Sequence, residues 1–197
     1  MEQRLILAAG EHTRFHALIP KQLCKVGSET LIHRQDRQFG FCTLVTKNDV
    51  LVKSFSPVFK PHEVETVLHT IKSCLRYYTV DLLFLLGDVY YSDAAARLIN
   101  DDKPGLHFYL NMYEVFAFRV NMSHREQVLN AIEFILSRQS EINHVKIWTL
   151  YRFLNGQKDL NEHNLFERMT TQINDTTQDF DTCQEFEDFK HHISKYK

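Results

Sequence analysis

The chain contains few of the residues that usually mark a special fold or compartment. Only four of its 197 residues are cysteines, and these lie far apart, with no CxxC pair among them. This spacing excludes a zinc site built on paired cysteines and is typical of reduced thiols in the cytoplasm. Glycine is also scarce, with six residues, so a glycine that directly follows an apolar strand is informative.

Long hydrophobic runs and an excess of positive charge are absent as well. No window approaches the roughly 18 apolar residues of a membrane span, and the N-terminal apolar stretch is too short for a signal peptide. The formal net charge of −2 argues against a general nucleic-acid-binding protein, which usually carries a basic excess. We therefore expect a cytoplasmic protein that binds neither a membrane nor nucleic acid.

What the chain does contain is an alternation of apolar and amphipathic segments. Its length predicts a single domain over residues 1–197. Strands are predicted at residues 5–9, 41–47, 50–55, 80–88, 106–110 and 113–120. Helices are predicted at residues 30–39, 62–78, 125–139 and 145–154, with a further helix after its cap Ser92. This order predicts an α/β fold with a mostly parallel sheet. The polar composition from Asn161 onward, taken alone, is that of a loose terminus, and only the resemblance described below makes this tail part of the site.

Two of the predicted strands end in residues that suit a phosphate ligand. The first ends at Gly10, where backbone N–H groups can approach an anion closely, and Arg14 and Lys21 follow it. The second ends at Gly87 and Asp88, where a carboxylate can hold Mg²⁺ against phosphates. The alternative for the first is an ordinary strand-to-helix turn with solvated cations, and the alternative for Asp88 is a turn cap. In open α/β sheets, ligands bind beyond such strand ends.

Taken together, three segments resemble the motifs of nucleotidyltransferases with the glycosyltransferase-A-like fold, which make nucleotide-activated sugars, sugar acids, polyols or choline phosphate. "LILAAGEHTRF" and "PKQLCKVGSETLIHRQ" resemble the family's phosphate loop and its Pro-Lys motif. "LLFLLGDVYYSD" resembles the second motif, in which the aspartate after glycine binds the metal. "DTTQDFDTCQEFEDF" resembles the third motif, usually written D-I-D-T-P-E-D.

The resemblance implies a three-layer α/β/α sandwich with a mixed, mostly parallel, Rossmann-like sheet. It implies Mg²⁺ held by Asp88 and Asp181, and catalytic roles for Lys21 and Arg14. It implies a nucleotide-binding set made of Leu7, Ala8, Ala9, Gly10, Glu11, His12, Thr13, Arg14, Lys21, Thr66, His69, Thr70, Gly87 and Asp88. Thr66, His69 and Thr70 are assigned there as base or ribose contacts, with plain core packing as the alternative.

The chain also departs from the family pattern. His12 stands in place of a second glycine, Cys183 in place of proline, and Glu185 in place of the last aspartate. Of the aspartates near Asp181, we expect both Asp175 and Asp179 to tolerate substitution. Lys146, Trp148 and Tyr151 could meet an acceptor, although an aromatic stripe at helical spacing is more often packing.

The resemblance further implies an activity. An NMP group would pass from an NTP to a small acceptor such as a sugar phosphate, polyol phosphate or phosphocholine, and pyrophosphate would leave. The compact length favours CTP. Two alternatives stay open: a glycosyltransferase of related fold, and a non-catalytic nucleotide-binding homologue. Either a monomer or a homodimer is compatible with the sequence.

Overall fold

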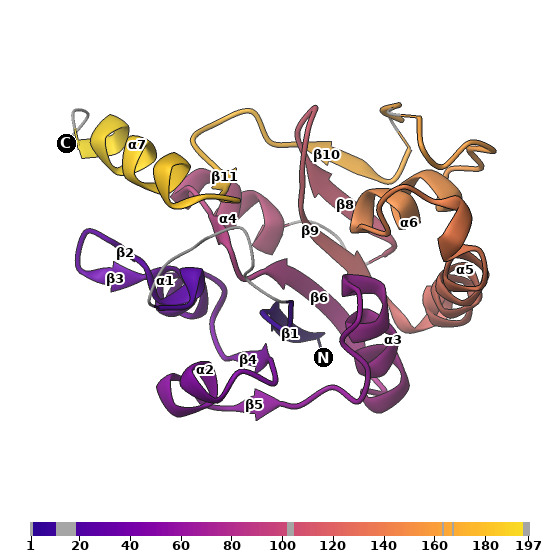
Figure 1. The fold of residues 1–197 in the computed structure, drawn as a ribbon, viewed down its shortest axis with the longest axis horizontal. Helices are drawn as coiled ribbons and strands as arrows, with labels where there is room; N and C mark the ends of the chain where they lie inside the picture. Colours follow the sequence, from indigo (N-terminus) through magenta and orange to yellow (C-terminus); the bar gives the residue numbers. More distant parts are fainter. Residues whose placement is uncertain (1, 11–18, 102–104, 163, 167, 195–197) are drawn as a thin grey trace.

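A seven-stranded sheet forms the centre of the molecule (Figure 1). The computed structural model describes residues 2–10, 19–101, 105–162, 164–166 and 168–194. The sheet has the order β10-β8-β9-β6-β1-β4-β5. Its strands are β1 (Glu2–Leu7), β4 (Cys42–Val45), β5 (Val58–Phe59), β6 (Asp81–Leu86), β8 (His107–Leu110), β9 (Val115–Val120) and β10 (Thr170–Gln172). Within it, β9 is antiparallel to β6 and β8 and the other pairs are parallel, which confirms the predicted mostly parallel sheet.

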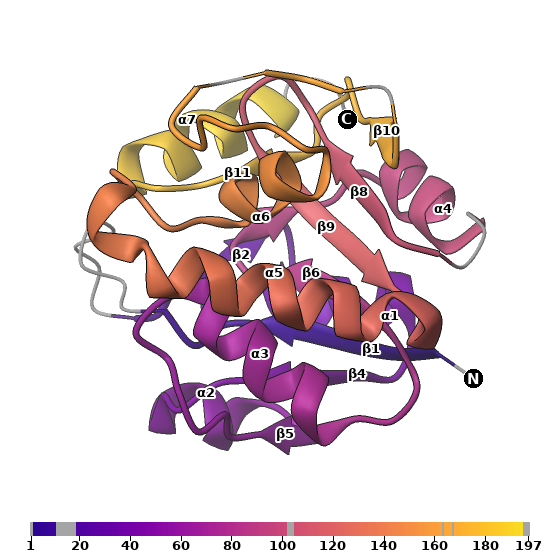
Figure 2. The ribbon, with the colours of Figure 1, turned by 90° about the vertical axis from the view of Figure 1, so that its right-hand side faces the viewer.

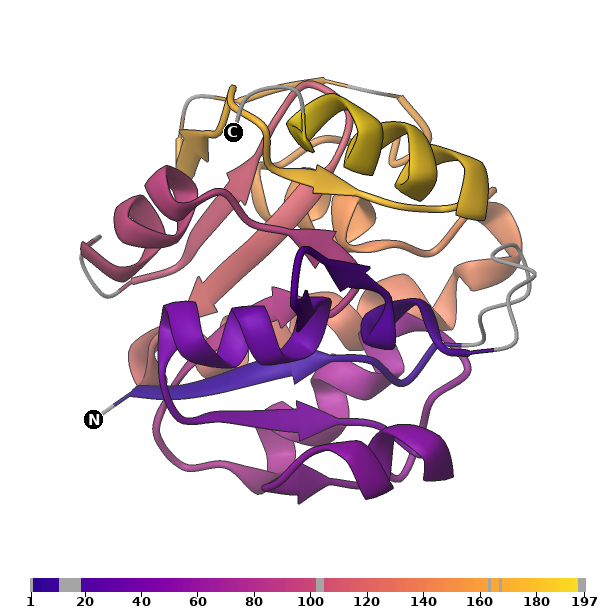
Figure 3. The same cartoon turned by 90° about the vertical axis from the view of Figure 1, so that its left-hand side faces the viewer.

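Helices cover both faces of this sheet. One face carries α3 (Val67–Tyr77), α5 (Arg125–Ser137) and α6 (Ile147–Leu154), in front of the strands in Figure 2. The other carries α1 (Leu31–Phe39), α2 (Asp49–Ser54) and α4 (Asp93–Asp101), and Figure 3 shows α1 lying in front of β1. In β1, Leu5 and Leu7 pack on the first side and Ile6 on the second, because successive side chains of a strand point to opposite faces. Both faces of the sheet are buried at residues 5–7, so this half of the strand is apolar, and the three-layer prediction is confirmed.

The polar C-terminal segment is folded rather than loose. β10 extends the sheet beside β8, and β11 (Gln178–Asp179) pairs antiparallel with β7 (Val89–Tyr90), directly after β6. α7 (Cys183–Ser194) then packs Phe186 and Phe189 against Phe180 and Leu31. These few aromatic residues anchor a segment whose average composition is polar.

Two predicted elements differ from the structure. Most of the strand predicted at residues 50–55 lies in helix α2 (Asp49–Ser54) instead. The side chain of Asn48 accepts hydrogen bonds from the backbone N–H of Val50 and Leu51 and so caps the helix start. The helix predicted from residue 62 begins at Val67, where Thr66 is the N-cap and accepts from the N–H of His69.

The structure also bears on the cysteines and on membrane contact. All four cysteines are free thiols, and burial raises the pKa of Cys42 and of Cys74 to about 12. Both are therefore inert packing residues.

Among the helices of the described residues, none combines the length and apolarity needed to cross a bilayer.

Candidate active site

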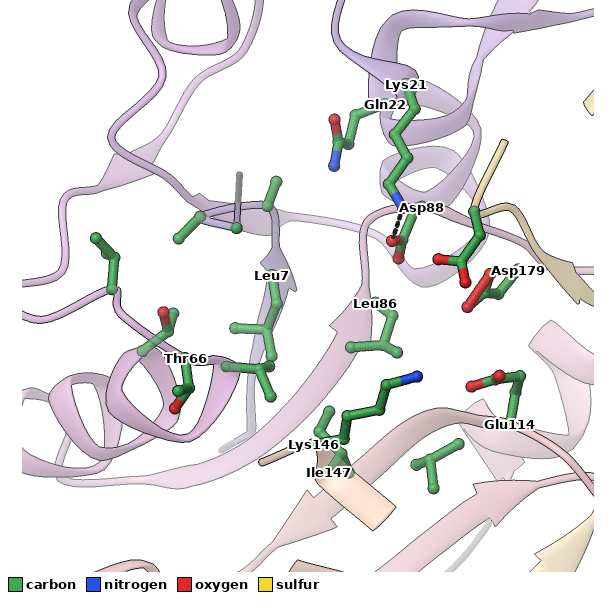
Figure 4. A pocket seen from close by; sticks show the side chains of 18 of the residues that line it. Leu7, Lys21, Gln22, Thr66, Leu86, Asp88, Glu114, Lys146, Ile147 and Asp179 are labelled. Atoms are coloured by element: carbon green, nitrogen blue, oxygen red, sulfur yellow. Dashed lines mark ion pairs between the residues drawn. The ribbon is translucent and has the colours of Figure 1, made fainter. Parts of the chain in front are cut away.

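A cavity of about 760 Å³ opens where the parallel strands β1 and β6 end (Figure 4). One part of its wall is formed by the residues after β1, the short 3₁₀ helix η1 (Lys21–Leu23) and the start of α3. The other part is formed by the end of β6, the starts of β9 and α6, and the segment at β11. Segments from the whole length of the chain thus meet at one edge of the sheet. This is the position at which open α/β sheets bind their ligands.

The two strand ends are held together by a close backbone contact. Leu7 pairs with Leu86, and the N–H of Gly87 donates to the carbonyl of Leu7 at 2.9 Å. A Cβ at position 87 would lie 2.8 Å from that carbonyl oxygen, so a side chain there would force the strands apart. At Gly10, by contrast, a Cβ would meet no described atom within 4 Å. Close packing against β1 therefore explains Gly87, whereas Gly10 lines the cavity.

Two buried polar side chains fix the turn that carries Asp88. The amide nitrogen of Gln35 on α1 donates to the carbonyls of Leu86 at 3.0 Å and Val89 at 2.8 Å, on either side of the Gly87-Asp88 pair. The hydroxyl of Tyr91 accepts from the N–H of Leu86 at 3.1 Å. Asp88 is therefore presented by a turn whose backbone groups are tied to two elements.

Lys21 reaches this turn from the opposite wall. Its Nζ forms an ion pair with the carboxylate of Asp88 and donates to the carbonyl oxygen of Phe180 at 2.9 Å. Burial lowers the pKa of Lys21, but the charge and hydrogen bond of Asp88, together with the charges of Asp179 and Asp181, outweigh burial and raise the pKa above its ordinary value. The lysine is a buried, permanently charged ammonium group.

The segment at β11 adds two carboxylates to the same wall. Asp179 pairs with Val89, the residue after Asp88, and both Asp179 and Asp181 line the cavity. Phe180 between them is fully buried in the cluster with α7, as the alternation of an extended chain requires. Burial, then the charges of Asp88 and Glu114, raise the pKa of Asp179 to about 8. Figure 4 shows Asp179 and Glu114 on the same side of the cavity.

Glu185, which departs from the family pattern, has a structural role in the turn after Asp181. Its carboxylate accepts from the N–H groups of Asp181 at 2.8 Å and Thr182 at 3.0 Å, while its own N–H donates to the hydroxyl of Thr182 at 3.2 Å. This is a capping box at the start of α7, for which glutamate three residues after threonine is a favoured choice. The longer acid therefore fixes the backbone of Asp181.

The opposite parts of the cavity come from α3 and α6. Thr66 and Thr70 line it, whereas His69 does not. The ring of His69 bonds to the hydroxyl of Thr66 at 3.0 Å and lies 3.7 Å from the carboxylate of Glu65. At α6, Lys146 and Trp148 line the cavity.

Tyr151 is the member of that aromatic stripe that belongs to the core. It is fully buried, and its hydroxyl donates to the carbonyl of Phe166 at 2.9 Å. In Figure 4 the side chain of Lys146 extends toward Glu114. The stripe is thus divided, with Lys146 and Trp148 at the cavity and Tyr151 in packing.

The structure brings most of the predicted site residues together. Those in the cavity wall are Leu7, Ala8, Ala9, Gly10, Lys21, Thr66, Thr70, Asp88 and Asp181. Gly87 lies behind the wall and His69 beside it. Glu11, His12, Thr13 and Arg14 lie outside the described residues, so their assignment stays a prediction.

Several further residues of the wall were not predicted, and the polar ones among them are Gln22, Glu65, Glu114 and Asp179. We expected Asp179 to tolerate substitution, but its burial beside Asp88 removes the basis for that expectation. The D-x-D alternation of Asp179 and Asp181 was a usable signal, because residues two apart in an extended segment share a side. No motif marked Gln22 or Glu114.

The carboxylates fit a magnesium ion that arrives together with a substrate. Their hard oxygens are the ligands that Mg²⁺ prefers. Among the described residues no group of three histidine, cysteine or acidic side chains is arranged as a complete metal site. Mg²⁺ needs no such cage, because it usually binds one or two carboxylates plus substrate phosphates and water.

Comparisons with known proteins identify the fold. Neither protein-family models nor curated protein sequences give a match. Solved structures do. A Bacillus anthracis protein described as a glucose-1-phosphate thymidylyltransferase, in complex with sucrose, aligns with TM-score 0.63 and 12% identity over 97% of this chain and 94% of its own. The CTP:phosphocholine cytidylyltransferase of Streptococcus pneumoniae aligns with TM-score 0.60 and 13% identity over 98% and 99%.

A third structure, the UDP-glucose pyrophosphorylase of Acinetobacter baumanii, aligns with TM-score 0.61 and 10% identity over 98% of this chain and 93% of its own. The chain has the nucleotidyltransferase fold. The resemblance indicated by the three motifs is thus confirmed at the level of the fold, because identities this low carry the architecture alone.

The role of Gln35 can be tested by Gln35→Leu. Loss of its amide leaves the carbonyl of Val89 without that donor and frees the turn of Asp88, so we expect a loss of about 1–3 kcal/mol in the free energy of unfolding. Urea denaturation measures this loss. Gln38→Leu is the matched control on the same helix, because Gln38 bonds to Tyr91 and Asp93 instead. Ligand binding at the cavity should weaken in the first variant and not in the second.

The burial of Asp179 predicts a pH dependence of stability. Its pKa is about 8 in the folded protein against an ordinary 3.8, so the folded state holds this proton more tightly and stability falls as the pH rises from about 4 toward 8. Asp179→Asn is neutral throughout. We expect it to reduce the loss of unfolding free energy between pH 5 and pH 8 by about 1–3 kcal/mol.

The matched control for this prediction is the exposed Asp175. Asp175→Asn should leave the pH dependence as it is in the wild-type protein. Parallel stability profiles for wild type and Asp179→Asn would show that the carboxyl group of Asp179 is not held in its neutral form.

Proposed function

We propose that the protein is a Mg²⁺-dependent nucleotidyltransferase that transfers an NMP group from an NTP to a small acceptor and releases pyrophosphate. The observation that carries this proposal is the convergence of Lys21, Asp88, Asp179 and Asp181 in one cavity at the carboxyl ends of β1 and β6. The fold shared with the three nucleotidyltransferase structures supports it.

On the nucleotide side, the chain offers backbone groups and cations. The backbone from Leu7 to Gly10 lines the cavity and would hold the nucleoside and its phosphates. Lys21 would neutralise phosphate charge, and Arg14 would add a bidentate contact. In the free protein Lys21 binds Asp88, so this ammonium would exchange a carboxylate for a phosphate when the nucleotide enters.

Asp88 and Asp181 would hold Mg²⁺, and the bound ion would neutralise charge on the phosphates. The carboxylates come from different segments, the β6–β7 turn and the turn before α7, and the backbone of each is fixed, by Gln35 and by Glu185. Positions held in this way require little rearrangement during the reaction. Positioning and electrostatic stabilisation supply most of the rate in phosphoryl and nucleotidyl transfer.

The acceptor would lie on the side of α6 and β9. Lys146 lines this part of the cavity and suits a phosphate or phosphonate group on the acceptor, with Trp148 and Glu114 completing the wall. An oxygen of the acceptor would attack the α-phosphate in line, and the bond to pyrophosphate would break. CTP is our preferred nucleotide, since the cytidylyltransferase structure matches this chain over nearly the full length of both.

The proposal is tested by pyrophosphate release from each of the four NTPs in the presence of Mg²⁺ and phosphorylated acceptors. Lys21→Met should lower turnover by about 100-fold or more, the usual effect of removing one group that stabilises transition-state charge. Lys25→Met is the control, because Lys25 is an exposed cation four residues along. Equal turnover of Lys21→Met and wild type would contradict the assigned role.

The same assay separates the other functions that share this fold. NTP binding by calorimetry without pyrophosphate release would indicate a non-catalytic nucleotide-binding protein. Release of a nucleoside diphosphate from a nucleotide sugar would indicate a glycosyltransferase. Either result would overturn the proposed nucleotidyl transfer.

A further inference from the structure

Thr46 is a buried polar residue directly after β4 to which the proposed reaction gives no role. Its exposed fraction is 0%, and its hydroxyl donates to the carbonyl oxygen of Ala8 at 2.8 Å. The same hydroxyl accepts from the N–H of Asn48, the N-cap of α2, at 3.1 Å. A hydroxyl has one proton, and the bond from Asn48 leaves that proton directed at Ala8. Thr46 thus ties the residue after β1 to the start of α2.

The backbone at the end of β1 keeps the alternation of a strand as far as Ala8. The carbonyl of Leu7 points toward β6, where it accepts from the N–H of Gly87 at 2.9 Å. The N–H of Ala8 points the other way and donates to the carbonyl of Val45 on β4, also at 2.9 Å. The carbonyl of Ala8 is on this second side as well, where it accepts from Thr46.

The hydroxyl of Thr46 replaces a donor that the sheet no longer supplies. In a parallel pair, the carbonyl of Ala8 would accept from a backbone N–H of the neighbouring strand. However, β4 ends at Val45, and the N–H of Thr46 donates to Phe59 beside β5 at 3.1 Å. The side chain therefore extends the pairing of β1 with β4 by one further bond.

This bond decides the direction of the next amide, the N–H of Ala9. The carbonyl and the following N–H point to opposite sides of a trans peptide, so the N–H of Ala9 points toward β6. At this level β6 has ended at Leu86, and the cavity that Ala9 lines begins there. None of the described residues accepts a hydrogen bond from this N–H. It is a donor that faces the cavity.

We propose that Thr46 is a positioning residue for nucleotide binding: by holding the carbonyl of Ala8 toward β4, it presents the N–H of Ala9 to an acceptor atom of the nucleotide. This inference rests on the proposed function. Thr46 itself does not line the cavity, so it acts through the Ala8–Ala9 peptide. Without the hydroxyl, the carbonyl of Ala8 loses its donor, and rotation of the peptide toward water would turn the N–H of Ala9 away from the ligand.

The test compares four proteins. Thr46→Val keeps the shape of the side chain but has no hydroxyl, and Thr46→Ser keeps the hydroxyl. Thr43→Val is the matched control, because Thr43 is a buried threonine on the same strand whose hydroxyl accepts from Gln3 at 3.1 Å, away from the cavity. Calorimetry with Mg²⁺ first identifies which of ATP, CTP, GTP and UTP binds the wild type, and then measures that nucleotide on each variant. Urea denaturation without nucleotide gives the stability of each protein.

We expect Thr46→Val to bind the nucleotide about tenfold more weakly than the wild type, as the loss of one hydrogen bond to the ligand would produce. Thr46→Ser and Thr43→Val should bind it as the wild type does. Both valine variants should be less stable than the wild type, because each leaves a buried polar group without its partner. Stability alone therefore does not account for the difference in affinity.

A further pair of variants covers the case in which Thr46→Val does not fold. Thr46→Cys and Thr46→Ser are similar in size, and a thiol is a weaker donor than a hydroxyl. Thr46→Cys should bind the nucleotide more weakly than Thr46→Ser, and equal affinities of these two variants would overturn the role of Thr46.

The outcomes separate this inference from the function on which it rests. Nucleotide binding by Thr46→Val with the affinity of the wild type would overturn the role of Thr46 alone, and so would an equal loss of affinity in Thr43→Val. Failure of all four NTPs to bind the wild type would overturn the proposed function, and the role of Thr46 with it.

Discussion

The ammonium group of Lys21 joins parts of the chain that are far apart in sequence. It pairs with Asp88 after β6 and bonds to the carbonyl of Phe180 at 2.9 Å, so that residues 21, 88 and 180 meet at one point. The charges of Asp88 and Asp181 would repel one another in this wall without the cation. Removing one partner of such a buried pair is strongly destabilising, because the other charge stays behind. Lys21 thus adds a polar link between the C-terminal segment and the β6–β7 turn, beside the β11–β7 pairing and the aromatic cluster of Phe180, Phe186 and Phe189.

This arrangement also decides how the site can respond to a ligand. A cation already occupies the space between the carboxylates, and the pKa of Asp179 is raised to about 8 by burial and by the charges of Asp88 and Glu114. The wall carries more negative charge than Lys21 alone can neutralise. A metal ion that enters with phosphates can supply the missing positive charge, while the phosphates give Lys21 a new anionic partner. Under the proposed function, charge balance would therefore link binding of the metal to binding of the nucleotide.

The sequence predicts this fold well where local chemistry and tertiary packing agree. Residues 5–7 of β1 and 82–85 of β6 are apolar because both faces of the sheet are buried there. Helices α1 and α4 begin where Thr30 and Ser92 accept backbone hydrogen bonds. The composition of residues 50–55 favours a strand, but the N-cap at Asn48 starts helix α2 there. Gln22, Glu114 and the burial of Asp179 could not be predicted, since each depends on which distant segment lies opposite. A sequence motif identifies the residues that follow a strand. Only the folded structure shows which distant segments form the other walls of the same cavity.

The buried charged and polar side chains of the cavity wall lower the stability of the fold. This cost indicates a ligand-binding site independently of the comparisons with known structures. Buried charges are often replaced by apolar residues with no loss, or with a gain, of stability. A chain under no demand but folding would do better with apolar residues at Lys21, Gln22 and Asp179, since each is largely removed from water. The same three residues share one cavity, and one of them contains an acceptor without a donor among the described residues. Buried residues that lower stability are expected to cluster where a protein binds a ligand or catalyses a reaction. Here the cluster combines a cation with carboxylates, which are the groups that the proposed NTP and its Mg²⁺ would require.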